Sequence, residues 1–150
     1  MKESLYLSKE ELMRADHLLF VSLKYTRTVD VIKSVIERLI STYDFGILAL
    51  LKHAQGNNKV SEIPTEPLAR TALIKKTYPY DNVLHDYLNF YIMLRRISKA
   101  NFSKLNEYRR HVTMLVTLDT EVIEINLDSI KEDYEKTTAF VEFVEQKIQA

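Results

Sequence analysis

Basic and aromatic side chains gather in one stretch of the chain, between residues 95 and 111. Cations neutralise phosphates and aromatic rings stack on bases, so this mixture is typical of a surface that binds nucleic acid. The residues that we assign to such a surface are Arg95, Arg96, Lys99, Lys104 and Tyr108. The alternative is structural, because arginines also complement the negative C-terminal ends of helices. The net charge of zero favours this alternative, since nucleic-acid-binding domains are usually basic.

His111 is the residue of this stretch whose side chain suits acid–base catalysis near neutral pH. A histidine beside a scissile phosphate serves as general acid or base, and a neighbouring arginine stabilises the charge that develops during cleavage. Arg109 and Arg110 directly precede His111 and are the candidates for that second role. These three residues form the candidate catalytic set.

The sequence indicates no metal site and no cofactor. Glu107 and His111 are four residues apart and would share one face of a helix, but two ligands are fewer than a metal site needs. A di-iron bundle requires Glu-x-x-His steps, and this chain has none. Because there is no cysteine, no glycine-rich phosphate loop and no Gly-x-Ser-x-Gly elbow, most named enzyme classes are excluded.

A second polar cluster lies between the first two predicted helices and contains Lys24, Tyr25, Arg27 and Asp30. Polar residues at such a junction cap the helix ends, or they contact a ligand. Both interpretations stay open for this cluster.

Composition predicts one domain that covers residues 1–150, because a chain with 46% hydrophobic residues and this length buries a single core. Lys plus Arg (21) equal Asp plus Glu (21), so any site for a polyanion must be local. The N-terminus lacks the apolar core of a signal peptide, and the longest apolar run, Phe45 to Leu51, is too short to cross a membrane. We therefore expect a cytoplasmic protein without membrane contact. Two glycines, 28% charged residues and no Cys or Trp favour a thermostable prokaryotic protein.

The element that must organise these residues is a long helix predicted over Val29 to His53. Its apolar residues recur at steps of three and four, which is the pattern of a helical face. The second half is apolar on nearly every side, so we expect neighbours to enclose it. Gly56 is the predicted left-handed cap at its end. The expected core residues are Ile32, Ile36, Leu39, Tyr43, Ile47, Leu50 and Ala54.

A shorter helix precedes the long one. Ser8-Lys9-Glu10-Glu11 has the form of a capping box and predicts the start of this helix, which would end near Tyr25. A connection of three residues follows, with Thr28 as the cap of the long helix, so the two helices must be antiparallel. The expected buried face contains Leu12, Ala15, Leu19 and Leu23.

Three helices are predicted next, at about residues 65–77, 81–98 and 103–111. Thr65 would cap the first, which carries Pro67 in its first turn and buries Leu68, Ala72 and Leu73. Asp81 would cap the second. The second helix has the clearest buried stripe, Leu84, Tyr87, Leu88, Tyr91 and Leu94.

The hydrophobic period then changes from 3.6 to two, which predicts a β-hairpin at about residues 111–127. A last helix follows, capped by Asp128 or Ser129. The predicted fold class is therefore mainly α: an antiparallel bundle of five to six helices with one small β-hairpin before the C-terminal helix. A lone hairpin leaves an open edge rich in Val and Ile, so we expect a homodimer that covers it.

This order of elements resembles the HEPN superfamily of nucleotide- and RNA-binding helical bundles. The resemblance is architectural and covers most of the chain, from the antiparallel pair with its long second helix to the final helix ending YEKTTAFVEFVEQKI. It implies a homodimer and RNA-related biology. Members that cut RNA carry an arginine that four to six intervening residues separate from a histidine, and His111 is the histidine placed late enough to fit. The positions counted back from it are Asn106, Leu105 and Lys104, so that arginine is absent.

Two functions follow from these observations. The preferred one is a non-enzymatic binding or regulatory module for RNA or a partner protein, because no constellation joins a nucleophile, a base and an orienting group. The alternative is a metal-independent ribonuclease of HEPN type that uses His111 with Arg109 and Arg110.

Overall fold

The structure is a computed structural model that describes all 150 residues. Its helices and strands follow one another along the chain as α1 (Lys2–His17), η1 (Leu18–Ser22), α2 (Leu23–Tyr25), α3 (Val29–Gly56), α4 (Pro67–Thr77), α5 (Asn82–Lys99), β1 (Asn101–Leu105), β2 (Thr113–Leu118), β3 (Glu121–Ile125) and α6 (Leu127–Gln149). The predicted class, a mainly helical bundle with a small β-structure before the C-terminal helix, is confirmed.

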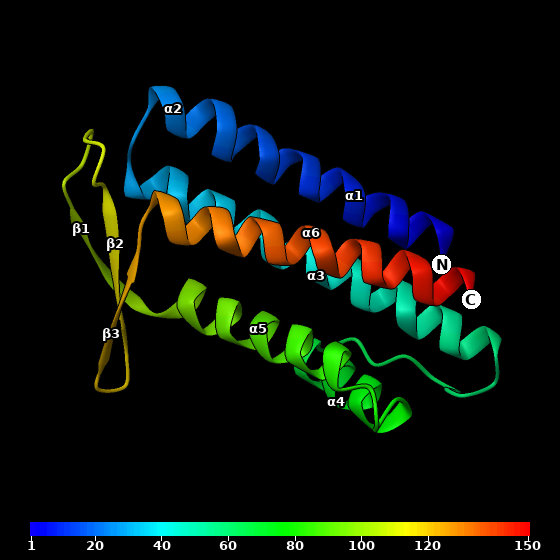
Figure 1. The fold of residues 1–150 in the computed structure, drawn as a ribbon. Coiled ribbons are helices and arrows are strands. Elements are labelled where there is room, and N and C mark those ends of the chain that lie inside the picture. The colour runs from blue at the N-terminus through cyan, green and yellow to red at the C-terminus, as the bar shows by residue number, and fades with distance from the viewer.

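The long helices lie side by side, and the sheet stands at one end of the bundle (Figure 1). α3 and α6 run away from the sheet, whereas α1 and α5 run towards it (Figure 1). Lys9 of α1 pairs with Glu145 of α6, so the beginning of the chain and its end meet far from the sheet. None of the helices combines the length and the apolar character that crossing a membrane requires.

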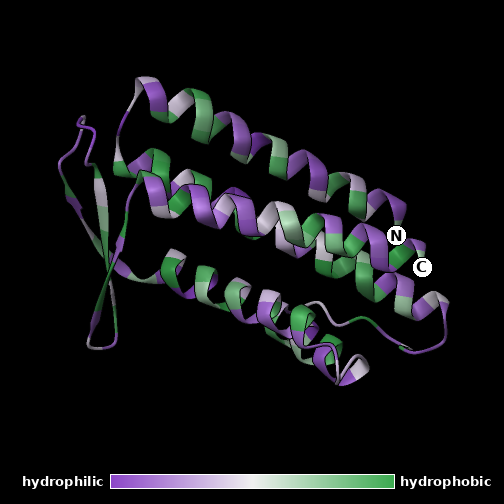
Figure 2. Ribbon diagram, viewed as in Figure 1, coloured by the Kyte–Doolittle hydropathy of each residue, from purple (hydrophilic) through white to green (hydrophobic).

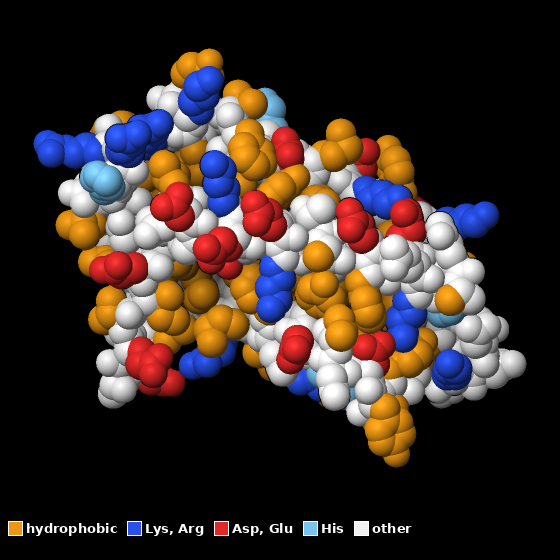
Figure 3. All heavy atoms as spheres, viewed as in Figure 1, with side chains coloured by type: hydrophobic (Ala, Val, Ile, Leu, Met, Phe, Trp, Pro, Cys, Tyr) orange, Lys and Arg blue, Asp and Glu red, His pale blue; other side chains and the backbone are white.

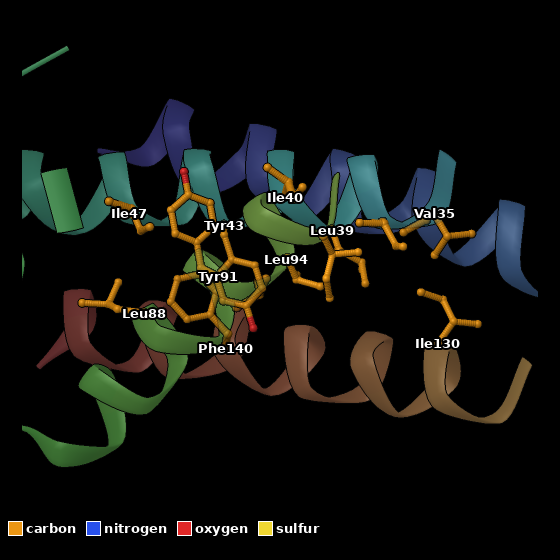
Figure 4. Packing of buried hydrophobic residues seen from close by; sticks show 14 of the residues in the cluster. Val35, Leu39, Ile40, Tyr43, Ile47, Leu88, Tyr91, Leu94, Ile130 and Phe140 are labelled. Carbon is orange, nitrogen blue, oxygen red and sulfur yellow. The ribbon is translucent and has the colours of Figure 1, made fainter. Parts of the chain in front are cut away.

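The long helix α3 is the centre of the core, as its sequence predicts. All seven expected core residues are buried, and Figure 2 shows that hydrophobic and hydrophilic residues alternate along the helices. At the middle of the bundle the ring of Tyr43 stacks on Phe140 of α6, with centroids 4.3 Å apart, and lies 5.7 Å from Tyr91 of α5 (Figure 4). One aromatic cluster therefore joins α3 to α5 and α6.

The expected start of the first helix at Ser8 is wrong, because α1 begins at Lys2. Ser8 lies inside the helix and is fully buried, and its hydroxyl donates to the carbonyl oxygen of Thr42 on α3 at 2.7 Å. The Glu11 carboxylate does not return a capping bond but accepts from Arg14 and Arg38. A serine's small side chain lets α1 approach α3 closely, so a tertiary contact replaces the local cap.

The connection between the first two helices agrees with the sequence. Residues 26–28 link α2 to α3, and the Thr28 hydroxyl accepts from the backbone N–H of Val31 at 3.3 Å. The cap at Asp81 is also confirmed, since its carboxylate accepts from the N–H of Leu84 at 3.0 Å. Both caps satisfy amide groups that a helix cannot satisfy internally, which explains why local sequence was sufficient.

Three other helix boundaries differ from expectation. Gly56 is not a left-handed cap: it is the last residue of α3, and Asn58 takes the positive φ of 62° instead. α4 does begin at Pro67, but Glu66 and not Thr65 precedes it, and no side chain caps it. α6 begins earlier than expected, because Asn126 and Ser129 form a reciprocal capping box.

α4 also buries a different face from the expected one. Leu68 and Ala72 are exposed and Leu73 is half-buried, whereas Thr71 and Ile74 are buried against α3 and α5. The helix is too short and too weakly amphipathic for its sequence to fix the side that packs. The α5 stripe, by contrast, is buried as expected, with Tyr87 half-exposed.

The predicted hairpin is present as β2 and β3, which pair in antiparallel fashion with Val116 opposite Ile123. The short helix expected over 103–111 is wrong. Residues 101–105 instead form β1, which pairs with β2 and makes a sheet of order β1-β2-β3. β1 is mostly exposed and lacks a period-two pattern of burial, so only its backbone pairing with β2 defines it as a strand.

Candidate functional site

The loop between β1 and β2, residues 106–112, carries the candidate catalytic residues. Arg109, Arg110 and His111 are all exposed. Figure 3 shows basic side chains and a histidine gathered at the end of the molecule where this loop lies. The loop turns back on itself through backbone hydrogen bonds from Arg109 N–H to Asn106 and from Val112 N–H to Arg109. We call residues 106–112 the basic loop.

The basic loop is fastened to the start of α3. The backbone N–H of Tyr108 donates to the carbonyl oxygen of Arg27 at 2.6 Å, and the Glu107 carboxylate accepts from the backbone N–H of Val29 at 3.0 Å. Tyr108 adopts a positive φ of 65°, which is uncommon for a residue with a large side chain. Its ring is 78% exposed, so the loop holds an aromatic surface in the solvent.

A cavity of about 390 Å³ lies behind the basic loop. Three separate parts of the chain form its wall: the α2–α3 connection, the β1–β2 loop and the first turns of α6. The lining residues are Arg27, Arg110, His111, Thr113, Asn126, Leu127, Asp128 and Lys131. Four of these side chains belong to arginine, histidine or lysine, and one belongs to an aspartate. We call this space the basic cavity.

The cations of the basic cavity have no carboxylate partner, because Arg27, Arg110 and Lys131 take part in none of the eight ion pairs of the protein. Lys131 lies 5.8 Å from the centre of the Phe20 ring. The Nε atom of Arg27 is buried and has no hydrogen-bond partner. Unpaired cations around a concave surface attract anions strongly, since no internal charge competes for them.

The other basic residues of the predicted nucleic-acid surface lie elsewhere and are mostly paired. Arg95 is 3.6 Å from the carboxylate of Asp44. Arg96 is 3.2 Å from Asp119, in the turn after β2. His111 precedes β2 and Asp119 follows it, so the six residues of the strand separate the two groups by roughly 20 Å.

Arg95, Arg96 and Lys99 share a second cavity, of about 330 Å³, with the first turn of α4. Lys99 has no ion pair. Lys104, on β1, binds Asp30 at 3.2 Å and lies 3.8 Å from Glu107. Its bond to Asp30 raises the pKa of the Lys104 ammonium, which lies at the surface. The cluster that is continuous in sequence is therefore divided in space.

Glu107 and His111 are four residues apart, but the structure does not place them on a helix. The two residues lie in a loop, where Glu107 caps α3, so they do not share a helical face. No group of three His, Cys, Asp or Glu side chains is arranged to hold a metal ion.

Two cations of the basic cavity, Arg27 and Lys131, are absent from the set predicted by sequence. Arg27 belongs to the second polar cluster noted at the junction of the first two helices, for which capping and ligand contact both stayed open. No sequence pattern marks Lys131 as a site residue, because a lysine in the second turn of a helix is an ordinary surface residue. Only the approach of α6 to the basic loop places it in the site.

Comparisons of this chain with protein-family models, curated proteins and solved structures gave no match.

Proposed function

We propose that this protein is a non-enzymatic RNA-binding module whose contact surface is the basic loop together with the basic cavity. The observation that carries the proposal is the set of unpaired cations, Arg27, Arg110 and Lys131, around one cavity beside the exposed Tyr108 ring. Such cations bind backbone phosphates, and an exposed ring next to them stacks on a base. RNA supplies both kinds of group in every nucleotide.

The chemistry supports a single-stranded ligand. A ring such as that of Tyr108 stacks on a base only when the base is unpaired, and the deep groove of an RNA duplex does not admit side chains. Neutral net charge does not oppose this function, because Glu107 of the basic loop and the nearby Asp30 of α3 both pair with Lys104 of β1. The cavity keeps a local excess of positive charge.

A direct test is the affinity of the protein for a mixed-sequence single-stranded RNA, measured by fluorescence anisotropy over a series of salt concentrations. Lys131→Ala removes one phosphate contact, so the slope of log K against log salt becomes smaller by roughly 0.7. Lys76→Ala is the matched control, because Lys76 is an exposed lysine of α4 without an ion pair, and its slope stays unchanged. Equal slopes for the two variants and the parent would contradict the proposal.

A second candidate function is a metal-independent ribonuclease of HEPN type. It is favoured by one observation, that His111 and Arg110 line the same cavity, as a general acid or base and a phosphate-binding cation must. Incubation of RNA with the parent and with His111→Ala separates the candidates. Cleavage by the parent that His111→Ala abolishes, with unchanged thermal stability, would establish the enzyme; intact RNA with salt-dependent binding supports the binding module.

If RNA neither binds nor is cleaved, the surface belongs to a protein ligand. The basic cavity and the exposed Tyr108 ring would then suit an acidic partner segment. That result would overturn the proposed RNA ligand.

Self-association through β3 is also part of the proposal. The outer edge of β3 has no partner strand in the chain, and Val122 is 63% exposed. Pairing with a second copy in antiparallel register, centred on Ile123, sets Glu121 opposite Ile125 and Glu124 opposite Val122. No two like charges then face each other directly, so the pairing carries no electrostatic penalty of the kind that destabilises sheets.

Light scattering at tens of micromolar tests the dimer. We expect twice the monomer mass of 17.6 kDa for the parent and the monomer for Val122→Glu, because the new carboxylate would lie directly opposite Glu124 of the second copy. Val83→Glu is the matched control, since Val83 is a valine of α5 that is 54% exposed, and it stays dimeric. A parent protein with the monomer mass would rule out this interface.

A further inference from the structure

We infer that the basic cavity binds a phosphate monoester and that, on the proposed RNA-binding function, this group is the phosphorylated end of the RNA strand. A strand without this end would place an internal phosphate against the same cations and would bind more weakly. The inference therefore names a ligand more specific than RNA in general.

Charge is the first argument for a monoester. Three permanent cations line the cavity and Asp128 is its one carboxylate, so the wall carries a net charge of +2 with His111 neutral. A phosphate monoester carries about −1.5 to −2 near neutral pH, whereas an internal phosphodiester carries only about −1. The monoester is the group that neutralises this wall.

The second argument comes from Arg27. Its backbone carbonyl is held by Tyr108, and its side chain reaches the cavity wall with Nε buried and without a hydrogen-bond partner. A buried donor of this kind is costly to leave unpaired, so it favours a ligand that accepts from it. The guanidinium group presents parallel donors in a fixed plane, and two oxygens of one phosphate match them.

The third argument is the size and position of the cavity. Its volume of about 390 Å³ is near the lower limit of small-ligand sites, which hold about 300 to 1,000 Å³, and suits one terminal nucleotide. Asn126, Leu127 and Asp128 of the wall form the start of α6, whose dipole adds positive potential. Asn126 and Ser129 already cap that end, so the helix contributes its field and not free amides.

The main experiment compares RNA strands of one sequence that differ only at their ends: hydroxyl at both ends, 5′-phosphate, and 3′-phosphate. Fluorescence anisotropy with an internally labelled strand gives the three dissociation constants at one salt concentration. We expect at least one phosphorylated strand to bind roughly tenfold tighter than the hydroxyl strand, as a charged hydrogen-bonded contact predicts. Which end gives the increase identifies the source of the monoester.

The result separates this inference from the proposed function. Equal affinity for all three strands would overturn the inference and leave RNA binding in place. Absence of binding for every strand would overturn the proposed function, and AMP then tests the cavity alone, with adenosine as its control. Saturable chemical-shift changes of the Arg27 and Arg110 amides with AMP and not with adenosine support the monoester site; no change with either overturns it.

Variants of the cavity wall sharpen the test. Arg27→Lys keeps the charge and loses the planar donors, so it removes most of the preference for the phosphorylated strand and changes the affinity of the hydroxyl strand little. Asp128→Asn removes the opposing carboxylate, so it tightens binding of the phosphorylated strand a few-fold. A purely structural role of these residues would shift the affinities for all strands together. Thermal melts of both variants verify that the protein is folded.

Discussion

The carboxylate of Glu107 accepts a hydrogen bond from the backbone N–H of Val29, at 3.0 Å, although 78 residues separate them in the chain. Val29 is the first residue of α3, and its amide has no partner within the helix. The negative charge of Glu107 also lies at the positive end of the helix dipole. One side chain therefore caps the central helix and fixes the basic loop at the same time.

Replacement of Glu107 tests this double role. Glu107→Ala leaves the Val29 amide without its acceptor, so we expect the free energy of unfolding to fall by about 1 kcal/mol and the RNA affinity to fall as the loop loosens. Glu107→Gln keeps an acceptor oxygen and loses less stability. Urea denaturation measures the change, and Glu62→Ala, at an exposed glutamate of the loop before α4, is the control without effect on either property.

Gly46 allows the close contact of α3 with α6. A Cβ atom at this position would lie 2.6 Å from Cε2 of Phe140, whose ring is fully buried and stacked on Tyr43. We therefore expect Gly46→Ala to lower the free energy of unfolding by about 1 to 3 kcal/mol, because the ring must move within a packed core.

The matched control is the second glycine of the chain. A Cβ atom at Gly56 would meet nothing within 4 Å, and its φ is not positive, so Gly56→Ala should stabilise the protein by about 0.5 kcal/mol. Thermal unfolding of the two variants measures these changes in stability, which we expect to have opposite signs. A destabilised Gly56→Ala or a stabilised Gly46→Ala would contradict the packing seen here.

Asp133 of α6 makes stability depend on pH. Burial, with a smaller contribution from Glu132, raises the pKa of the Asp133 carboxyl from 3.8 to about 6. Folding therefore disfavours the ionised Asp133 carboxylate. The stabilisation that the protonated carboxyl contributes to the folded state is complete below about pH 3.8 and is lost as pH rises through about 6. Stability should fall between pH 4 and pH 7.

Asp133→Asn removes this dependence, because an amide does not ionise. We expect the variant to unfold with a free energy about 2 kcal/mol higher than the parent at pH 7.5 and nearly equal to it at pH 4. Urea denaturation across this pH range measures the difference. Glu135→Gln, at an exposed position of the same helix, should follow the parent curve.

The paired arginines of the second cavity should contribute less to RNA binding than those of the basic loop. Asp119 already neutralises Arg96, so Arg96→Ala should leave the salt slope of RNA binding nearly unchanged. Arg110 is unpaired, and Arg110→Ala should make that slope smaller by roughly 0.7. A larger effect at Arg96 would move the proposed contact surface to the α4–α5 side of the molecule.

Local sequence determined much of the fold. The helical repeat of α3 and α5, the run of β-branched and large apolar residues in β2, the period of two in β3, and the caps at Thr28 and Asp81 all follow from residues within a few positions of one another. Such features depend on backbone groups that neighbouring side chains satisfy, so they need no distant contact to form. The basic stretch was also visible, since it is contiguous in the chain.

Tertiary structure decided what the local pattern left undefined. Residues 101–105 lack the alternation of buried and exposed residues that is typical of a strand. They form β1 only because their backbone groups pair with those of β2. Ser8 has the pattern of a cap, yet its hydroxyl binds a carbonyl of the adjacent helix. The basic cavity brings together Arg27, Arg110 and Lys131 from three distant segments, and no local sequence pattern predicts that these residues lie close together. A site of this kind forms only when the helices and the sheet have packed, because charge and concavity both arise from the approach of separate elements.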